Sequence, residues 1–193
     1  MRLLLGSLFA LAVAAIVGLG MTYFALTHGA AFSGLSIGSW IALPKTGTLD
    51  ADPYARATFA RSGQLPIALG DGVSFTAHTD DSGKLLDGRC DVELSGITPA
   101  ARFWTLTLYN PDGELVANTV SRYGFTSQEI VRHADGSFDI AVAPRANAGN
   151  WLPTGGVERY ILVLRFYDTS VGVATRAERE APMPSIKSMG TCS

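Results

Sequence analysis

The sequence predicts an all-β protein, a β-sandwich or barrel with one or two short helices, preceded by an N-terminal transmembrane helix. Three observations support this. Residues 3–26 carry no charged side chain. After residue 70, apolar and polar residues alternate in several short segments separated by Gly, Pro, Asn and Asp, which is the pattern of half-buried strands joined by turns. Strand and helix patterns do not alternate, which argues against a parallel α/β fold.

The N-terminal segment is long enough to cross a membrane. Arg2 is followed by the uncharged residues 3–26, and about 20 apolar helical residues span a hydrocarbon core of about 30 Å. A cleaved signal peptide has a shorter apolar region of about 7–15 residues, although the small residues 29–31 leave cleavage open. We favour an uncleaved signal anchor over residues 1–29. Arg2 and the terminal amine are expected to stay in the cytoplasm and the rest of the chain to lie outside it.

The segment that follows predicts a spacer and then a short helix. Residues 30–39 are small and polar, so one domain over residues 40–193 is the simplest division. Asp52 suits an N-cap, Pro53 the first helical position, and Gly63 a C-terminal stop. A helix of about ten residues is marginal by itself, so we expect it to dock on the sheet.

The strand predictions centre on residues 102–110, which end in a Pro-Asp-Gly turn. This strand presents Trp104, Leu106 and Leu108 on one face. Residues 159–167 are apolar on both faces and are predicted to be a central strand. Other strands are expected at residues 73–78, 90–95, 114–118 and 138–142, with an edge segment at 182–192 because proline is restricted to sheet edges. The opposite face of the first strand lines a concave surface or packs under the helix; it holds Phe103, Thr105, Thr107 and Tyr109.

Composition excludes several function classes. The net charge of −2 predicts no attraction to nucleic acid. No Cys-x-x-Cys or His-Glu-x-x-His spacing is present, so we expect no metal and no cofactor. Four aspartates are oxygen ligands in principle, but each lies in a Gly-containing turn, where Asp is expected for local hydrogen bonds, and no calcium-loop spacing connects them. They are Asp80, Asp81, Asp112 and Asp135.

Catalytic residues are not predicted. Ser127 and His133 lie near a short helical turn, but their spacing does not fix them as a nucleophile–base pair, and no Gly-x-Ser-x-Gly segment exists. We therefore expect a capping serine and an exposed histidine. Whether the chain is an enzyme stays open, with no catalytic constellation in favour of it.

Two Gly-containing loops hold the candidate ligand or partner residues. These are Arg122 with Tyr123, and Asn150 with Trp151. Exposed aromatic side chains and arginine on the loops of a rigid sandwich often bind partners. The alternative is that Trp151 plugs the end of the sandwich and Asn150 satisfies loop backbone groups.

The two cysteines predict a disulfide between Cys90 and Cys192. Outside the cytoplasm thiols tend to pair. Cys90 begins an alternating strand, and Cys192 lies in a tail that would fray unless tied down. The bond would close a loop of about 100 residues, with Cα atoms about 4.4–6.8 Å apart. The alternative is one buried and one mobile thiol.

Five segments, taken together, resemble one bacterial family, domain of unknown function 1214. They are residues 50–56 (DADPYAR), 86–91 (LDGRCD), 103–109 (FWTLTLY), 122–127 (RYGFTS) and 149–153 (GNWLP). The resemblance covers residues 40–192 and implies a jelly-roll-like sandwich. In larger relatives this domain follows a second one, numbered 1254, which we expect to be missing from this short anchored version. The family implies no catalytic residues.

These observations favour a binding or assembly module of the bacterial envelope. The expected location is the inner membrane, crossed once by residues 3–26, with the C-terminal domain in the periplasm. The expected partner is a companion envelope protein or a second copy of the chain. The alternative is the accessory subunit of an enzyme whose site is completed by a separately encoded companion domain.

Overall fold

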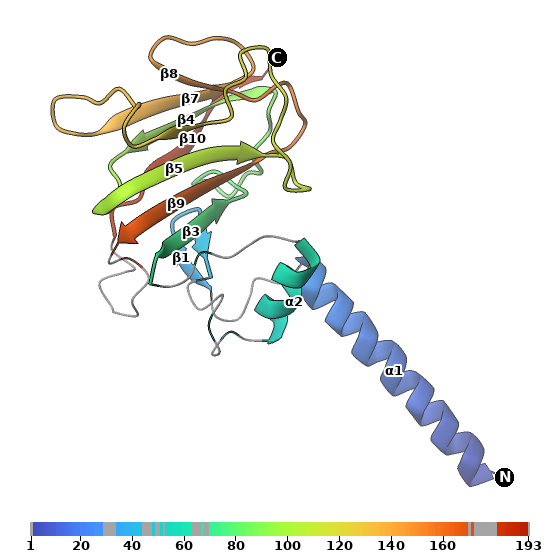
Figure 1. Cartoon of the computed structure of the whole chain (residues 1–193). Helices are drawn as coiled ribbons and strands as arrows, with labels where there is room; N and C mark the ends of the chain where they lie inside the picture. The colour runs from blue at the N-terminus through green and yellow to red at the C-terminus, as the bar shows by residue number, and fades with distance from the viewer. Residues whose placement is uncertain are drawn as a thin grey trace.

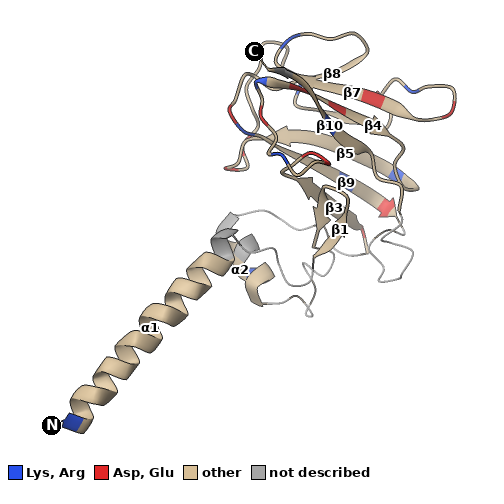
Figure 2. Cartoon of the chain, turned by 180° about the vertical axis from the view of Figure 1, so that it is seen from behind, with Lys and Arg blue, Asp and Glu red and all other residues tan. Residues whose placement is uncertain are grey.

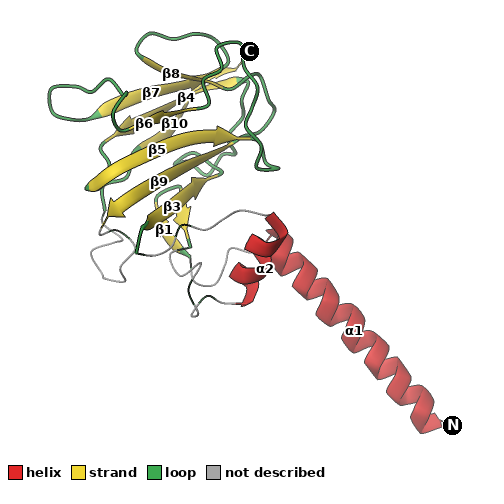
Figure 3. Ribbon diagram, viewed as in Figure 1, coloured by secondary structure: helices red, strands yellow, loops and turns green. Residues whose placement is uncertain are grey.

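The computed structural model describes residues 2–28, 34–43, 48, 51, 53–62, 67, 70–169, 171 and 181–192. In this part of the chain there are two helices and ten strands (Figure 3). The helices are α1 (Arg2–His28) and α2 (Pro53–Ser62). The strands are β1 (Leu35–Ile37), β2 (Trp40–Ala42), β3 (Gly72–Ala77), β4 (Cys90–Gly96), β5 (Ala101–Tyr109), β6 (Gly124–Thr126), β7 (Phe138–Ala143), β8 (Asn150–Pro153), β9 (Ile161–Thr169) and β10 (Ser185–Cys192).

The strands form two sheets of a sandwich (Figure 1). The six-stranded sheet has the order β1-β2-β3-β9-β5-β6, and the four-stranded sheet has the order β10-β4-β7-β8. Neighbouring strands are antiparallel except β7 and β8, which are parallel. The chain changes sheet between β3 and β4, and does so repeatedly up to the last crossing between β9 and β10. The predicted all-β, jelly-roll-like sandwich with an N-terminal apolar helix is confirmed.

The core lies between the two sheets, where the alternating pattern places it. Trp104, Leu106 and Leu108 of β5 are at most 3% exposed. Trp104 stacks on Phe138 of β7, with ring centroids 5.3 Å apart. Each large apolar side chain buried in this way stabilises the fold by about 1.5–3 kcal/mol. The contact between β5 and β7 therefore holds one sheet against the other.

The predicted central and edge strands occupy those positions. β9 lies between β3 and β5, and its outward Ile161 and Val163 are only 8% and 5% exposed. β10 is an edge strand of the four-stranded sheet. The prediction of a strand at residues 114–118 is wrong. The turn before it already engages Glu114, and this segment forms only an isolated bridge, between Leu115 and Tyr109. In this turn Asn110 N–H donates to Glu114 O (2.9 Å).

The short helix forms at the predicted residues, but it does not pack on the sheet as expected. α2 lies beside the end of α1 and not over the outer face of β5 (Figure 1), so the prediction that it docks on the sheet is wrong. α2 contacts α1 and has one buried residue in the described part of the chain, Ala55, which is 2% exposed. β1 lies inside the segment predicted as a spacer, residues 30–39, so the sheet begins before Trp40. The predicted cap Asp52, stop Gly63 and cleavage segment 29–31 lie outside the described residues.

Helix α1 projects away from the sandwich. Residues 2–25 form a helix long and apolar enough to cross a membrane, and none of this span is buried within the protein. Arg2 is the only charged residue along it (Figure 2). A helix that is apolar on all sides and packs on no protein core has the surface that lipid would cover.

Candidate functional site

The sandwich has two lateral sides where edge strands of the two sheets face each other. The β1–β10 side is formed by the β1–β2 hairpin and β10, and the β6–β8 side by β6 and β8. β1 and β3 are the strands near α1, whereas β7 and β8 lie at the opposite end of the sandwich (Figure 1). The two sides therefore differ in their distance from α1.

Asp81 closes the β1–β10 side. Its backbone N–H donates to Ile186 O (2.9 Å), and its carboxylate Oδ2 accepts a hydrogen bond from Ile186 N–H (2.9 Å). Both backbone groups at this point of an edge strand are thus paired, as they would be with a neighbouring strand. Oδ1 accepts from the Ser39 hydroxyl (2.7 Å), and the Trp40 indole N–H donates to Pro184 O (2.8 Å). The turn between β3 and β4 therefore fastens β10 to the β1–β2 hairpin.

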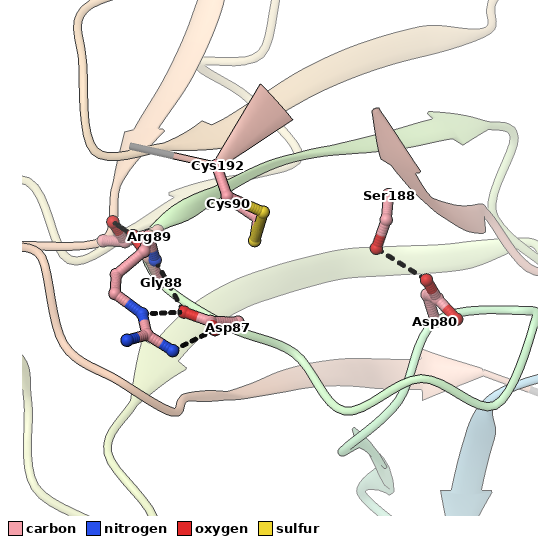
Figure 4. Close-up of a disulfide and its surroundings, with 8 residues drawn as sticks. Asp80, Asp87, Gly88, Arg89, Cys90, Ser188 and Cys192 are labelled. Atoms are coloured by element: carbon pink, nitrogen blue, oxygen red, sulfur yellow. Dashed lines mark hydrogen bonds and ion pairs between the residues drawn. A yellow bond between two sulfur atoms is a disulfide. The ribbon is translucent and has the colours of Figure 1, made fainter. Parts of the chain in front are cut away.

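Asp80 is buried beneath this turn, at 3% exposure. Its Oδ1 accepts hydrogen bonds from Ser82 N–H (3.0 Å), the Ser82 hydroxyl (2.6 Å) and Lys84 N–H (3.0 Å), and its Oδ2 accepts from the Ser188 hydroxyl (2.6 Å) (Figure 4). Burial raises the pKa of Asp80, but the hydrogen bonds from Ser188, Ser82 and Lys84 outweigh it and lower the pKa to about 2. Asp80 is an ionised structural group that binds β10.

A hollow of about 520 Å³ lies beside these aspartates. It is lined by the β1–β2 turn, the turn at residues 79–83 and residues 181–185. Asp80 and Asp81 contribute to the lining, but their oxygens already accept the hydrogen bonds described above. Among the described residues, no group of three or more His, Cys, Asp and Glu gathers to hold a metal ion.

The predicted disulfide is confirmed: Cys90 of β4 is bonded to Cys192 of β10 (Figure 4). The Cα atoms are 3.9 Å apart, so the predicted range of 4.4–6.8 Å is wrong. The two residues are register partners on adjacent antiparallel strands, and the register shifts between Ser188 and Cys192. Their separation is shorter than the roughly 4.5 Å of a close antiparallel pair. Cys90 is 5% exposed, whereas Cys192 is exposed. The bond ties the end of the chain to the β1–β10 side.

Arg89, next to this disulfide, is paired with Asp87. Its Nε and Nη2 donate to the two carboxylate oxygens at 3.0 and 2.7 Å (Figure 4). The hydrogen bonds from the Arg89 side chain and backbone lower the pKa of Asp87 to about 2. This pair shows the two-point geometry that an arginine adopts when a carboxylate is within reach.

Asn150 closes the β6–β8 side. Its Oδ1 accepts from Val131 N–H (2.9 Å), and its Nδ2 donates to Val131 O (2.8 Å) and Asp139 O (2.8 Å). The side-chain amide thus pairs with a backbone segment as a peptide group would. Asn150 is 8% exposed, so the expectation that it satisfies loop backbone groups fits this geometry.

Arg122 joins the two predicted loops. The Asn118 side chain accepts from Arg122 N–H (3.0 Å) and donates to Arg122 O (2.8 Å), which fixes the backbone. The guanidinium lies 5.4 Å from the centre of the Phe125 ring and donates through Nη1 to Trp151 O (2.9 Å). The side chain is thus held between the segment leading into β6 and β8.

Four residues form what we call the edge patch: Arg122, Tyr123, Val131 and Trp151. Tyr123 is 36% exposed and Val131 is 67% exposed. Trp151 is half-buried, and its indole N–H donates to Ala143 O (3.0 Å). Trp151 is therefore a partly exposed residue of the edge strand β8. Sequence reasoning missed Val131, because its neighbours show no strand or turn pattern that would place it beside Asn150.

Ser127 and His133 have different partners. The Ser127 hydroxyl accepts from Trp104 N–H (3.3 Å), whereas His133 Nε2 lies 2.7 Å from Asp139 Oδ2. His133 and Asp139 are both more than half exposed. Ser127 holds the chain against β5, and the two residues do not form a nucleophile–base pair.

Residues 71–171 match the family described as "Protein of unknown function (DUF1214)". The chain belongs to the DUF1214 family. The matched segment runs from β3 to β9 and includes the Asp80–Asp81 turn and every residue of the edge patch. It leaves out α1, the β1–β2 hairpin and β10, so Cys192 lies outside the DUF1214 match.

Two solved structures resemble this DUF1214 protein. The VPA0106 protein of Vibrio parahaemolyticus has a TM-score of 0.56 and 25% identity, over 72% of this chain and 36% of that one. An uncharacterised protein from Burkholderia cenocepacia has a TM-score of 0.47 and 16% identity, over 87% of this chain and 39% of that one. The chain thus spans about a third of the length of the Vibrio protein. None of the curated proteins matches it significantly.

Proposed function

We propose that this DUF1214 protein is a membrane-anchored binding or assembly module of the bacterial envelope. In this proposal α1 crosses the inner membrane once and the sandwich lies in the periplasm. The uncharged span of α1 and the position of Arg2 before it support the anchor and its orientation. The Cys90–Cys192 disulfide supports an oxidising compartment.

The edge patch is the observation that carries the binding role. It contains Tyr123, Val131 and Trp151 together with Arg122, and β8, which holds Trp151, lies at the end of the sandwich away from α1 (Figure 1). Aromatic residues and arginine are the residue types that dominate protein–protein interfaces. The patch is held by β6, β8 and the Asn150–Val131 pair, so a partner would meet a surface that is already ordered.

A separately encoded envelope protein is the proposed partner. The shared domain accounts for 36% of the Vibrio protein, so in that protein the domain is joined covalently to further sequence. The second candidate function is the accessory subunit of an enzyme whose catalytic residues lie in that partner.

Topology is tested with reporters fused after Ser193. A reporter active only in the periplasm should be active, and one active only in the cytoplasm should be silent. The opposite result would reverse the proposed orientation.

The binding role is tested by purifying the tagged full chain from native membranes under mild detergent. We expect a second protein in stoichiometric amount, or a self-associated oligomer by size analysis. A monomer with no retained protein would refute the proposal. A retained protein whose enzymatic activity falls when this chain is removed would select the accessory-subunit function.

A further inference from the structure

We infer that Arg122 is a receptor for a carboxylate of the partner protein, supplied by an Asp, a Glu or a C-terminus. This inference rests on the proposed binding function and specifies its chemistry. Arg122 is exposed and belongs to the edge patch, and three features of its surroundings point to this role.

The first feature is that Arg122 is held in place before any partner arrives. Asn118 fixes its backbone through two hydrogen bonds, and Phe125 and Trp151 O fix its guanidinium. An exposed arginine normally samples many rotamers, and ordering it costs conformational entropy. Because the fold already orders the Arg122 side chain, less conformational entropy is lost on binding.

The second feature is the missing counter-ion. None of the ion pairs among the described residues involves Arg122. The one described hydrogen bond of its guanidinium uses Nη1 and a neutral carbonyl, which leaves other N–H groups of the guanidinium fork for a ligand. Arg89, the residue before β4, binds Asp87 through two such groups. Arg122 has the same chemistry without the carboxylate.

The third feature is the apolar rim. Tyr123 adjoins Arg122 in sequence, Trp151 accepts its hydrogen bond, and Val131 is tied to Asn150 beside Trp151. A partner covering these side chains would exclude water from the guanidinium and so strengthen a charged hydrogen bond. The hollow described above lies on the other, β1–β10 side. An exposed edge suits a protein surface, so the carboxylate is assigned to a protein partner.

The test uses the full chain in native membranes and a water-soluble carbodiimide. This reagent adds to a carboxyl group to form an O-acylisourea, and a nearby amine then attacks the acyl carbon, which forms an amide and releases the reagent as a urea. Arginine does not react in this way, whereas the Arg122→Lys variant places a primary amine at the same position. The matched control is Arg145→Lys, since Arg145 is an exposed arginine in the neighbouring loop between β7 and β8. Mass spectrometry locates each amide.

We expect Arg122→Lys to give an amide between position 122 and an Asp, Glu or C-terminus of the partner, at least tenfold above Arg145→Lys. In purification without reagent, Arg122→Gln should reduce partner recovery at least tenfold, and Arg145→Gln should leave it unchanged. Equal recovery with Arg122→Gln, and no amide at position 122, would overturn the carboxylate role while leaving the binding function in place. Failure of the wild-type chain to retain any partner would overturn both.

Discussion

The two sides of the sandwich pair the backbone groups of their edge segments through different side chains. On each side one polar side chain pairs with a backbone segment that lacks a neighbouring strand: Asp81 pairs with Ile186, and Asn150 pairs with Val131. The β1–β10 side adds the buried carboxylate Asp80 and a disulfide. The β6–β8 side has a neutral amide and no covalent bond among its described contacts.

This difference assigns stability to the β1–β10 side and recognition to the β6–β8 side. On the β1–β10 side the carboxylates of Asp80 and Asp81 accept hydrogen bonds from within the chain. Their oxygens are therefore engaged in holding β10. On the β6–β8 side Arg122 keeps N–H groups free of any carboxylate among the described residues, and Val131 is 67% exposed. We therefore expect mutations on the first side to affect folding and mutations on the second to affect binding.

The largest effect on stability should come from the disulfide. Replacing Cys90 and Cys192 by Ser should lower the free energy of unfolding by about 4 kcal/mol, because the bond closes a long loop in the unfolded chain. Urea unfolding of the full chain in detergent measures this. Reducing agent should produce the same loss in the wild type and none in the double variant. A loss below about 1 kcal/mol would show that the disulfide does not make the β1–β10 side the more stable one.

Asp80→Ala should follow, with a loss of about 3 kcal/mol. The substitution leaves Ser82 N–H, Lys84 N–H and the Ser188 hydroxyl without their acceptor at a site that is 3% exposed. The control is Asp112→Ala, in an exposed Gly-containing turn, which should change stability by less than about 0.5 kcal/mol. Similar losses in the two variants would show that Asp80 acts only as a turn residue.

Acid should weaken the hydrogen bonds by which the Asp80 carboxylate holds β10. The pKa of Asp80 is lowered from 3.8 to about 2 in the folded protein, so folding favours the ionised carboxylate. Its contribution is present above about pH 4 and is lost as the pH falls through 2, by about 2 kcal/mol. Asp87 titrates in the same direction, so the quantity to measure is the difference between wild type and Asp80→Asn from pH 5 to pH 1.5. Parallel stability curves would contradict this role.

Asn150→Ala should cost less, about 1–2 kcal/mol, and the loss should not depend on pH between 4 and 8. Three hydrogen bonds are lost, but the exposed position of Val131 lets water replace part of them. Asn147→Ala, in the exposed loop before β8, is the matched control and should be nearly neutral in urea unfolding. A loss as large as that of Asp80→Ala would make the two sides energetically equivalent.

The sequence predicts those features that depend on local pattern. Alternation around Trp104 and the apolar character of both faces of residues 161–167 place β5 and β9 correctly, and the prolines near residue 182 predict an edge strand. The hydrogen bonds by which Asp81 and Asn150 close the two sides could not be predicted in the same way. Asp81 in a Gly-containing turn has the appearance of a local turn residue, yet its partner Ile186 is 105 residues away. Asn150 pairs with Val131, which belongs to no strand.

The site residues show the same limit. Aromatic residues and arginine in Gly-containing loops indicated Arg122 and Trp151, and the fold brings them within hydrogen-bonding distance. Asn118, which fixes the Arg122 backbone, gave no separate signal, because an Asn in a loop has many local uses. Residue type thus suggested the patch, whereas its rigidity depends on contacts that only the fold supplies.

Photo-cross-linking from one residue on each side tests the central contrast most directly. A photoreactive amino acid replaces Tyr123 in the edge patch or Met189 on β10, in the full chain in native membranes. Met189 is 56% exposed and Tyr123 is 36% exposed, so exposure alone predicts more cross-linking from Met189. We predict the reverse: Tyr123 cross-links the same protein that is retained in purification, and Met189 gives only background. Equal or greater capture of that protein from Met189 would contradict the assignment of binding to the β6–β8 side.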